Sequence, residues 1–412
     1  MRILFSSLGS PGHTYPLIPL ARAAVAAGHE VLFATSAELH PVLADAGCAV
    51  AEAGEGLREA FFTTFGSHLG RSPQPPPTLP DTERELLYAK AFGDVLPRAF
   101  LAGLLPLIER DRPDLVVHEA GNPGAALAGK HAGVPTVCHA FGLAPIELGP
   151  GFAEALHAVA ADAGVTLPSG PALGTAGDPY LDLCPPSLQR TELAEAVPAV
   201  ALRPAPFAPP AQLPAVVRDR VPGRPLVYLT LGTVIGAADV LRAAADGLSA
   251  LDADILVATG PSVSADVLGD LPPNVTVQPW VPQADVIPLA DLVVHHGGFN
   301  TTLTALAAAV PQVVLPSRAN AFDGLDRIAA SGAVEHLPPD TADGDAVADA
   351  AARVLAGPGY AAAARKLAEE IAAMPSADDV AARLPALAAG QPVQSGTSTM
   401  RTTAAESSTP GA

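Results

Sequence analysis

The feature that most restricts the fold of this 412-residue chain is a repeated unit of short apolar run, small-residue loop and helix. At the start of the chain, residues 2–6 read as a buried strand, residues 7–14 as a Gly- and Pro-containing loop, residues 16–27 as a helix and residues 30–34 as a second strand. Two parallel strands joined by a crossover helix form a βαβ unit. We therefore expect an α/β fold with parallel sheets covered by helices.

The same unit returns in both halves of the chain. A strand over residues 115–118 precedes a helix over 123–132 and a strand over 136–140. In the second half, further strands are predicted over residues 226–231, 255–258, 275–278, 292–295 and 312–315. Two Rossmann-like, doubly wound domains follow from this pattern, because the chain is too long for one hydrophobic core.

Prolines mark the boundary between the two domains. Residues 185–225 are crowded with proline and lose helical and strand periodicity. A second Pro-rich stretch over residues 73–80 reads as a surface segment, and Ser, Thr, Gly and Pro dominate the last residues. The predicted organisation is a first Rossmann-like domain over 1–205, a Pro-rich linker over 206–224, a second Rossmann-like domain over 225–390 and a disordered tail over 391–412.

Charge and composition exclude several classes of function. The net charge of −19 repels nucleic acid and anionic membranes, so any anionic ligand needs local groups to hold it. The three cysteines, Cys48, Cys138 and Cys184, lie far apart without metal-ligand spacing, and an odd count forms no closed disulfide framework. The chain opens on a strand and contains no uninterrupted run of about 20 apolar residues. We expect a cytoplasmic protein with no membrane insertion.

Two residues at the carboxyl ends of predicted strands form a candidate catalytic pair. The sequence Gly-Ser-Pro-Gly-His at residues 9–13 places the His13 imidazole beside a helix start, and Glu119 follows the strand over 115–118. A carboxylate at the same sheet edge can orient an imidazole and stabilise its protonated form. The alternatives are a capping histidine and an acid favoured by a helix dipole.

A third loop offers an anion site. Residues 295–302, His-His-Gly-Gly-Phe-Asn-Thr-Thr, lie between an apolar strand and a helix. Two glycines and small hydroxyl side chains at a helix N-terminus suit a diphosphate, because free backbone N–H groups point outward there. The alternative is a Gly-rich turn in which threonines cap the helix. We favour the anion site, because capping does not need two glycines beside a pair of histidines.

These motifs, in this order, resemble the GT-B inverting glycosyltransferases of the UDP-glycosyltransferase superfamily, particularly the actinobacterial natural-product enzymes. The resemblance extends from residue 1 to about 390 and includes Trp-Val-Pro-Gln at 280–283, the motif over 295–302 and Val-Pro-Gln at 310–312. It implies that the first domain binds a hydrophobic small-molecule acceptor and the second binds a nucleotide-sugar donor, across a central cleft. No metal is required in this family's reaction. By this resemblance His13 is the general base and Glu119 is its supporting acid, a position more often occupied by Asp.

The resemblance also assigns the donor site. Leaving-group charge falls on the β-phosphate, near His296 and the start of the following helix, and Trp280 lies near the nucleotide base. Packing between the domains is the alternative for this tryptophan. The implied donor-binding residues are Thr233, Trp280, Val281, Gln283, His296, Gly297, Gly298, Asn300, Thr301 and Asn320.

The chain departs from the family at two positions. Thr304 replaces the acid that in many relatives holds the ribose hydroxyls, which suits the deoxyribose of a dTDP-sugar, although UDP is not excluded. Asn320-Ala321 replaces the usual Asp-Gln, whose side chains bind sugar hydroxyls. A deoxy sugar suits this change, and so does an impaired enzyme.

The acceptor side is less constrained. Phe61, Phe92 and Phe141 are candidates to bind a flat aglycone, with core packing as the alternative. Two other functions stay open: a sugar-nucleotide epimerase of similar fold, and a partner subunit that has lost donor recognition. The sequence does not decide between a monomer and a homodimer, nor between O-, N- and C-glycosidic products.

Overall fold

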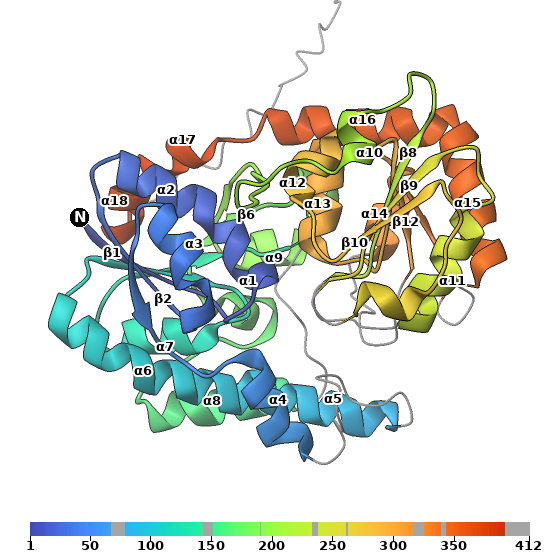
Figure 1. Ribbon diagram of the computed structural model, residues 1–412. Helices are drawn as coiled ribbons and strands as arrows, with labels where there is room; N and C mark the ends of the chain where they lie inside the picture. The colour runs from blue at the N-terminus through green and yellow to red at the C-terminus, as the bar shows by residue number, and fades with distance from the viewer. Residues whose placement is uncertain are drawn as a thin grey trace, which may run out of the picture.

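The computed structural model contains two parallel sheets side by side, each covered by helices (Figure 1). It describes residues 1–66, 79–142, 151–189, 191–232, 238–260, 263–315, 325–338 and 343–391. The predicted α/β architecture of two doubly wound domains is confirmed.

The N-terminal sheet has seven parallel strands in the order β3-β2-β1-β4-β5-β6-β7. Its strands are β1 (Arg2–Ser6), β2 (Glu30–Thr35), β3 (Ala49–Glu52), β4 (Leu115–Glu119), β5 (Thr136–His139), β6 (Tyr180–Asp182) and β7 (Ala199–Ala201). The helices of this half are α1 (Pro11–Thr14), η1 (Tyr15–Leu17), α2 (Ile18–Ala26), η2 (Ala37–Leu39), α3 (His40–Asp45), α4 (Leu57–Phe65), α5 (Asp81–Lys90), η4 (Ala91–Val95), α6 (Leu96–Asp111), α7 (Pro123–His131), α8 (Phe152–Asp162), η5 (Gly170–Thr175), η6 (Pro186–Leu188) and α9 (Thr191–Ala196).

The C-terminal sheet has six parallel strands in the order β10-β9-β8-β11-β12-β13. Its strands are β8 (Leu226–Thr230), β9 (Asp254–Ala258), β10 (Val275–Gln278), β11 (Leu292–His295), β12 (Gln312–Val314) and β13 (Val334–His336). The helices that follow β7 are α10 (Ala215–Arg218), α11 (Ala238–Leu248), η7 (Ala265–Leu268), α12 (Gln283–Val286), η8 (Ile287–Leu289), α13 (Phe299–Ala307), α14 (Leu325–Ala330), α15 (Gly344–Ala356), α16 (Pro358–Ala372), α17 (Ala377–Ala381) and α18 (Leu384–Ala388).

The predicted strands are present, with ends that differ by at most one residue from those expected. Four strands were not predicted: β3, β6, β7 and β13, each of three or four residues. β3, β7 and β13 are edge strands that are only partly buried, so they leave no continuous apolar run in the sequence. The expectation that residues 185–225 lack regular structure is wrong in part, because α9, β7 and α10 lie there.

The first helix begins earlier than the sequence predicts. Residues 7–14 were expected to form a loop, but α1 begins at Pro11, after Ser10 in extended conformation, and includes His13. Pro16 and Pro19 then lie near the starts of η1 and α2, where their missing N–H groups break no helical hydrogen bond. The prolines divide this helical segment into three short pieces. At its far end, Gly28 has φ 82° and allows the chain to turn into β2, as predicted.

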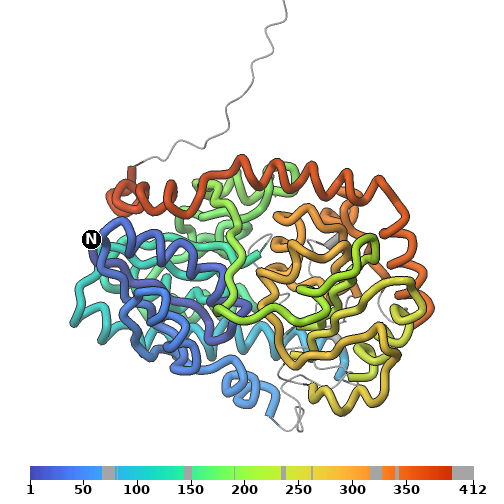
Figure 2. The backbone as a smooth tube through the Cα atoms, turned by 45° about the horizontal axis from the view of Figure 1, so that its top comes forward, coloured from blue at the N-terminus to red at the C-terminus, as the bar shows by residue number. Residues whose placement is uncertain are grey.

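The last two helices return to the N-terminal half of the molecule. After α16, the chain crosses so that α17 contacts α2 and α18 contacts β5 (Figures 1 and 2). The backbone N–H of Arg203 donates to the carbonyl of Pro375 at 2.8 Å, which fastens this crossing to the segment after β7. By their position in the chain, residues 225–390 are all predicted to belong to the second domain. Position alone does not reveal that α17 and α18 pack on the first sheet's half.

One long apolar helix runs beneath the N-terminal sheet. α5, the π-helical turn η4 and α6 are continuous, and residues 82–111 are long and apolar enough, by length and composition, to cross a membrane. α6 packs against α7 and α8, and Leu96, Phe100 and Leu104 are buried against β1 and β4. Its apolar face is thus used within the protein core.

The contact between α11 and α15 allows a stability test. A Cβ atom at Gly247 would lie 1.9 Å from the carbonyl oxygen of Gly344, so the two helices touch backbone to backbone. We expect Gly247→Ala to lower the free energy of unfolding by about 1–3 kcal/mol, because rigid backbone atoms must move. Gly359→Ala, where a Cβ meets nothing within 4 Å, is the matched control and gains about 0.5–1 kcal/mol. Urea denaturation measures both, and equal effects would contradict the close packing.

Candidate functional site

The strand orders fix where a ligand can bind. In each sheet the connections run outward in opposite directions from one central pair of strands, β1 and β4 in the first sheet and β8 and β11 in the second. Loops that leave the carboxyl ends of such a pair diverge and open a crevice. The predicted site residues lie at the carboxyl ends of these strands: His13 follows β1, Glu119 is the last residue of β4 and His296 follows β11.

The structure brings His13 and Glu119 together. His13 Nδ1 lies 3.0 Å from Glu119 Oε1, and the side chains are 16% and 0% exposed. The Nδ1–H direction is not aligned with this oxygen for a hydrogen bond. The contact is therefore a close approach in which Nδ1 is the ring nitrogen beside the carboxylate.

Backbone groups hold the Glu119 carboxylate in place. Oε1 accepts a hydrogen bond from the N–H of Gly121 at 2.6 Å, and Oε2 accepts one from the N–H of Leu8 at 3.4 Å. These donors come from the loops after β4 and β1 and compensate for the burial of the charge. The sequence predicted the pair, but it did not predict these donors.

Phe141 lies against the His13 ring. The two ring centroids are 4.6 Å apart with an interplanar angle of 28°. Phe141 follows β5, the strand next to β4, so it reaches the same edge of the sheet as Glu119. Its side chain is 9% exposed.

In the C-terminal half, His296 packs between two glycines. A Cβ atom at Gly232 would lie 2.5 Å from His296 Cε1, and one at Gly298 would lie 2.5 Å from Nε2. Burial lowers the pKa of His296 to about 4, against the opposing effect of a hydrogen bond with the Thr230 backbone, so the imidazole is neutral at neutral pH. Gly232, which follows β8, was not singled out by the sequence.

The neighbouring histidine, His295, is held by hydrogen bonds within the protein core. His295 Nδ1 accepts the N–H of Gly297 at 3.1 Å, and its Nε2 donates to Gln312 Oε1 at 2.8 Å. Burial lowers its pKa to about 3. The pair at 295–296 is thus divided: His295 ties β11 to β12, and His296 lies beside the glycines.

Helix α13 begins directly after this turn. Its N-cap Gly298 is extended and provides no side-chain cap, so the N–H groups of the first turn stay available for an anion. Thr301 contacts Gln283, whose Nε2 donates to Thr301 Oγ1 at 3.2 Å. Asn300 lies in the same first turn, and the hydroxyl of Thr304 donates to its carbonyl at 2.7 Å.

The remaining predicted donor residues are only partly described. Val281 is buried, whereas Trp280 is 47% exposed and has a free face. Thr233 and Asn320, with Ala321, lie outside the described residues, as do most of the 73–80 segment and nearly all of the predicted tail.

The predicted acceptor residues separate in space. Phe61 and Phe92 pack together with centroids 5.9 Å apart, in a cluster with Phe65 and Tyr88 on α4 and α5. Phe141 lies elsewhere, beside His13. Binding of an aglycone by these rings stays a prediction.

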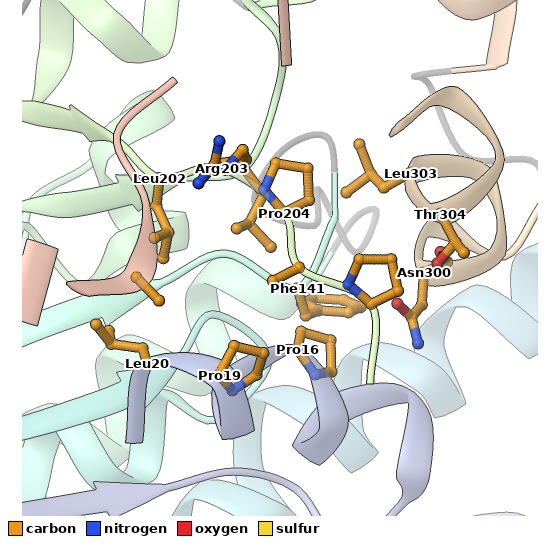
Figure 3. A pocket seen from close by; sticks show the side chains of 14 residues that line it. Pro16, Pro19, Leu20, Phe141, Leu202, Arg203, Pro204, Asn300, Leu303 and Thr304 are labelled. Atoms are coloured by element: carbon orange, nitrogen blue, oxygen red, sulfur yellow. The ribbon is translucent and has the colours of Figure 1, made fainter. Parts of the chain in front are cut away.

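A small pocket lies between the two halves, next to Phe141 (Figure 3). Its walls are Pro16 and Pro19 from the first helical segment, residues 202–206 after β7, and Asn300 and Thr304 of α13. Figure 3 shows the Phe141 ring at its centre, between the prolines and α13. The pocket therefore joins the surroundings of His13 to the start of α13.

Two buried carboxyls, Asp178 just before β6 and Asp182 at its end, have pKa values shifted in opposite directions. Burial raises the pKa of Asp182 to about 7, although its Oδ1 accepts the N–H of Cys184 at 2.8 Å. Burial also opposes ionisation of Asp178, but hydrogen bonds and charges from His118 and Lys130 outweigh it and lower its pKa.

Within the described part of the chain, no group of three His, Cys, Asp or Glu side chains is arranged to hold a metal ion. That the reaction needs no metal stays a prediction.

Known proteins place the chain in a family. Models of the N- and C-terminal domains of erythromycin biosynthesis protein CIII-like proteins match residues 22–232 and 242–387. L-demethylnoviosyl transferase of Streptomyces niveus is 34% identical over 94% of this chain and 98% of its own length. Elloramycin glycosyltransferase of Streptomyces olivaceus is 35% identical over 93% of this chain and 97% of its own.

Solved structures agree with these relatives. The structure of a Streptomyces sp. SF2575 glycosyltransferase complexed with thymidine diphosphate matches with a TM-score of 0.74 and 29% identity, covering 94% of this chain and 99% of the other. The predicted GT-B fold is confirmed by this match. Because the relatives are named transferases, the epimerase alternative is not supported.

The Asp182 carboxyl predicts a pH dependence of stability. The folded state keeps its proton up to about pH 7, whereas an unfolded Asp releases it near 3.8, so stability falls as the pH rises through this window. We expect Asp182→Asn to raise the free energy of unfolding at pH 8 by about 1–4 kcal/mol, with the gain vanishing toward pH 4. Asp178→Asn, which removes a paired charge, should instead destabilise at pH 8. Urea denaturation at both pH values measures this; a gain for Asp182→Asn that did not depend on pH would contradict it.

Proposed function

The chain belongs to the erythromycin biosynthesis protein CIII-like glycosyltransferases, and from this premise we propose that it transfers a deoxy sugar from a thymidine diphosphate carrier to a hydroxyl group of a hydrophobic natural product. The anomeric carbon is inverted in a single displacement. The observation that carries the proposal is the approach of His13 to the buried Glu119 at the crevice of the N-terminal sheet.

In this proposal His13 is the general base. Its Nδ1 edge faces Glu119, so Nε2 is the nitrogen that takes the proton of the acceptor hydroxyl. The acceptor oxygen bonds to the anomeric carbon as the bond to the β-phosphate oxygen breaks, and the electron pair of that bond leaves with the diphosphate. Glu119, fixed by the N–H groups of Leu8 and Gly121, stabilises the imidazolium that forms.

The leaving diphosphate is received by the second half of the molecule. The uncapped start of α13 presents backbone N–H groups, and the neutral His296 adds a hydrogen-bond donor without the desolvation cost of a buried charge. We propose that these donors stabilise the leaving group without a metal ion. Trp280, with its exposed face, is the proposed neighbour of the base.

Thymidine as the nucleoside is supported by Thr304. Its hydroxyl hydrogen is already donated to the Asn300 carbonyl, and a threonine has no carboxylate to bind a pair of ribose hydroxyls. A 2′-deoxyribose lacks one of these hydroxyls and leaves less unsatisfied. The solved relative with thymidine diphosphate supports the same donor.

Calorimetric titration tests the donor site. Thymidine diphosphate should bind the wild type more tightly than uridine diphosphate does, and His296→Ala should weaken its binding by about 10- to 100-fold, since a buried hydrogen bond to a charged group is lost. His13→Ala, on the other side of the crevice, serves as the control and should bind nearly as well as the wild type. If neither nucleotide bound at millimolar concentration, the donor site would be refuted and the partner-subunit hypothesis favoured.

Removal of the base tests the chemistry. We expect His13→Ala to lower kcat by about 10²–10⁴-fold, the usual contribution of a positioned general base, and Glu119→Gln to lower it by a smaller factor while the fold is retained. The assay follows transfer from a dTDP-deoxyhexose to a panel of aromatic polyketide aglycones by mass. Full activity of His13→Ala with unchanged regiochemistry would exclude His13 as the base.

A further inference from the structure

Three rings form a continuous chain from the first domain to the second. The His13 and Phe141 rings stack at 4.6 Å, and the Phe141 and Phe299 rings meet edge to face at 6.0 Å with an interplanar angle of 81°. His13 lies in α1 and Phe141 follows β5, whereas Phe299 is the first residue of α13. The chain therefore connects two different sheets.

The backbone is shaped to allow this contact. A Cβ atom at Gly142 would lie 2.3 Å from Cγ of Phe299, so only glycine lets the segment after β5 approach the Phe299 ring so closely. Phe141 and Phe299 are 9% and 8% exposed, and both belong to an apolar cluster that includes residues from the two halves. Phe141 thus has little free surface to offer an aglycone.

The row of three rings ends at the donor-site turn on one side and at the His13–Glu119 pair on the other. Phe299 lies between Gly298 and Asn300, in the turn that offers N–H groups to the diphosphate. At the other end, His13 Nδ1 is 3.0 Å from Glu119 Oε1 but is not aligned with it for a hydrogen bond. A small rotation of the imidazole decides whether that bond forms, and the Phe141 face limits such a rotation.

We propose that Phe141 and Phe299 are positioning residues that form an aromatic bridge, through which the donor-site end of α13 holds the His13 imidazole in its catalytic orientation. The inference rests on the proposed function. Neither phenylalanine touches the reacting atoms in this account. Nucleotide binding at α13 fixes Phe299, Phe299 fixes Phe141, and Phe141 fixes the ring that faces Glu119.

Nuclear magnetic resonance of histidine tests the bridge with thymidine diphosphate alone. Protein labelled with ¹³C at histidine Cε1 gives a His13 signal that is identified by its loss in His13→Gln. In the wild type, this signal should carry an upfield ring-current shift that Phe141→Leu removes, and it should move when thymidine diphosphate saturates the protein. In Phe299→Leu the movement should disappear at thymidine diphosphate concentrations that calorimetry shows to saturate this variant.

Matched variants separate the bridge from general packing. Leu367→Ala, on α16 in the same apolar cluster, removes apolar contacts without a ring and should leave the His13 response intact. Phe299→Tyr keeps the ring and should keep the response. A response in Phe299→Leu equal to that of the wild type would overturn the bridge, and so would its loss in Leu367→Ala.

Failure of the bridge and failure of the proposed function give different results. Thymidine diphosphate that binds the wild type without moving the His13 signal overturns the bridge alone. Absence of nucleotide binding overturns the donor site, and the bridge with it.

Discussion

The reversal of strand connection beside β1 and again beside β8 is the constraint on which the site depends. The first sheet contains the order β3-β2-β1-β4 and the second contains the corresponding order β10-β9-β8-β11. Each sheet therefore has one pair of neighbouring strands, β1 and β4 or β8 and β11, whose following loops diverge. The first crevice receives His13 and Glu119, and the second receives His296 and the start of α13. In the proposed mechanism the base lies in one half and the anion site in the other, so the reaction requires the two sheets to face one another.

Burial and backbone contacts hold the polar groups at these crevices in place. Glu119 is fully buried, yet it accepts hydrogen bonds from two backbone N–H groups and faces an imidazole. His296 is packed between glycines and stays neutral. In the proposed mechanism one half accepts the proton of the acceptor hydroxyl and the other donates hydrogen bonds to the departing anion, and sugar transfer needs both.

The sequence predicted the architecture well because parallel strands buried on both faces leave continuous apolar runs. It missed β3, β6, β7 and β13, which have three or four residues each, and it placed the start of the first helix too late at Pro16, since Ser10 and Pro11 looked like a loop. The pairing of His13 with Glu119 followed from strand ends alone. The packing of Gly232 on His296 and of Phe299 on Phe141 depends on how distant loops meet, and no local pattern encodes that meeting.

The return of α17 and α18 to the N-terminal half changes how recombinant hybrids of this family should be built. Exchange of everything after a single junction at residues 206–224 would bring a foreign α17 onto the native α2 and a foreign α18 onto the native β5. A hybrid with two junctions, the second near Pro375 where the chain crosses, keeps both contacts native while it replaces the donor-binding sheet. The N-terminal structural unit is thus discontinuous in sequence, because it includes α17 and α18. A hybrid therefore needs its second junction where the chain crosses between the halves, near Pro375.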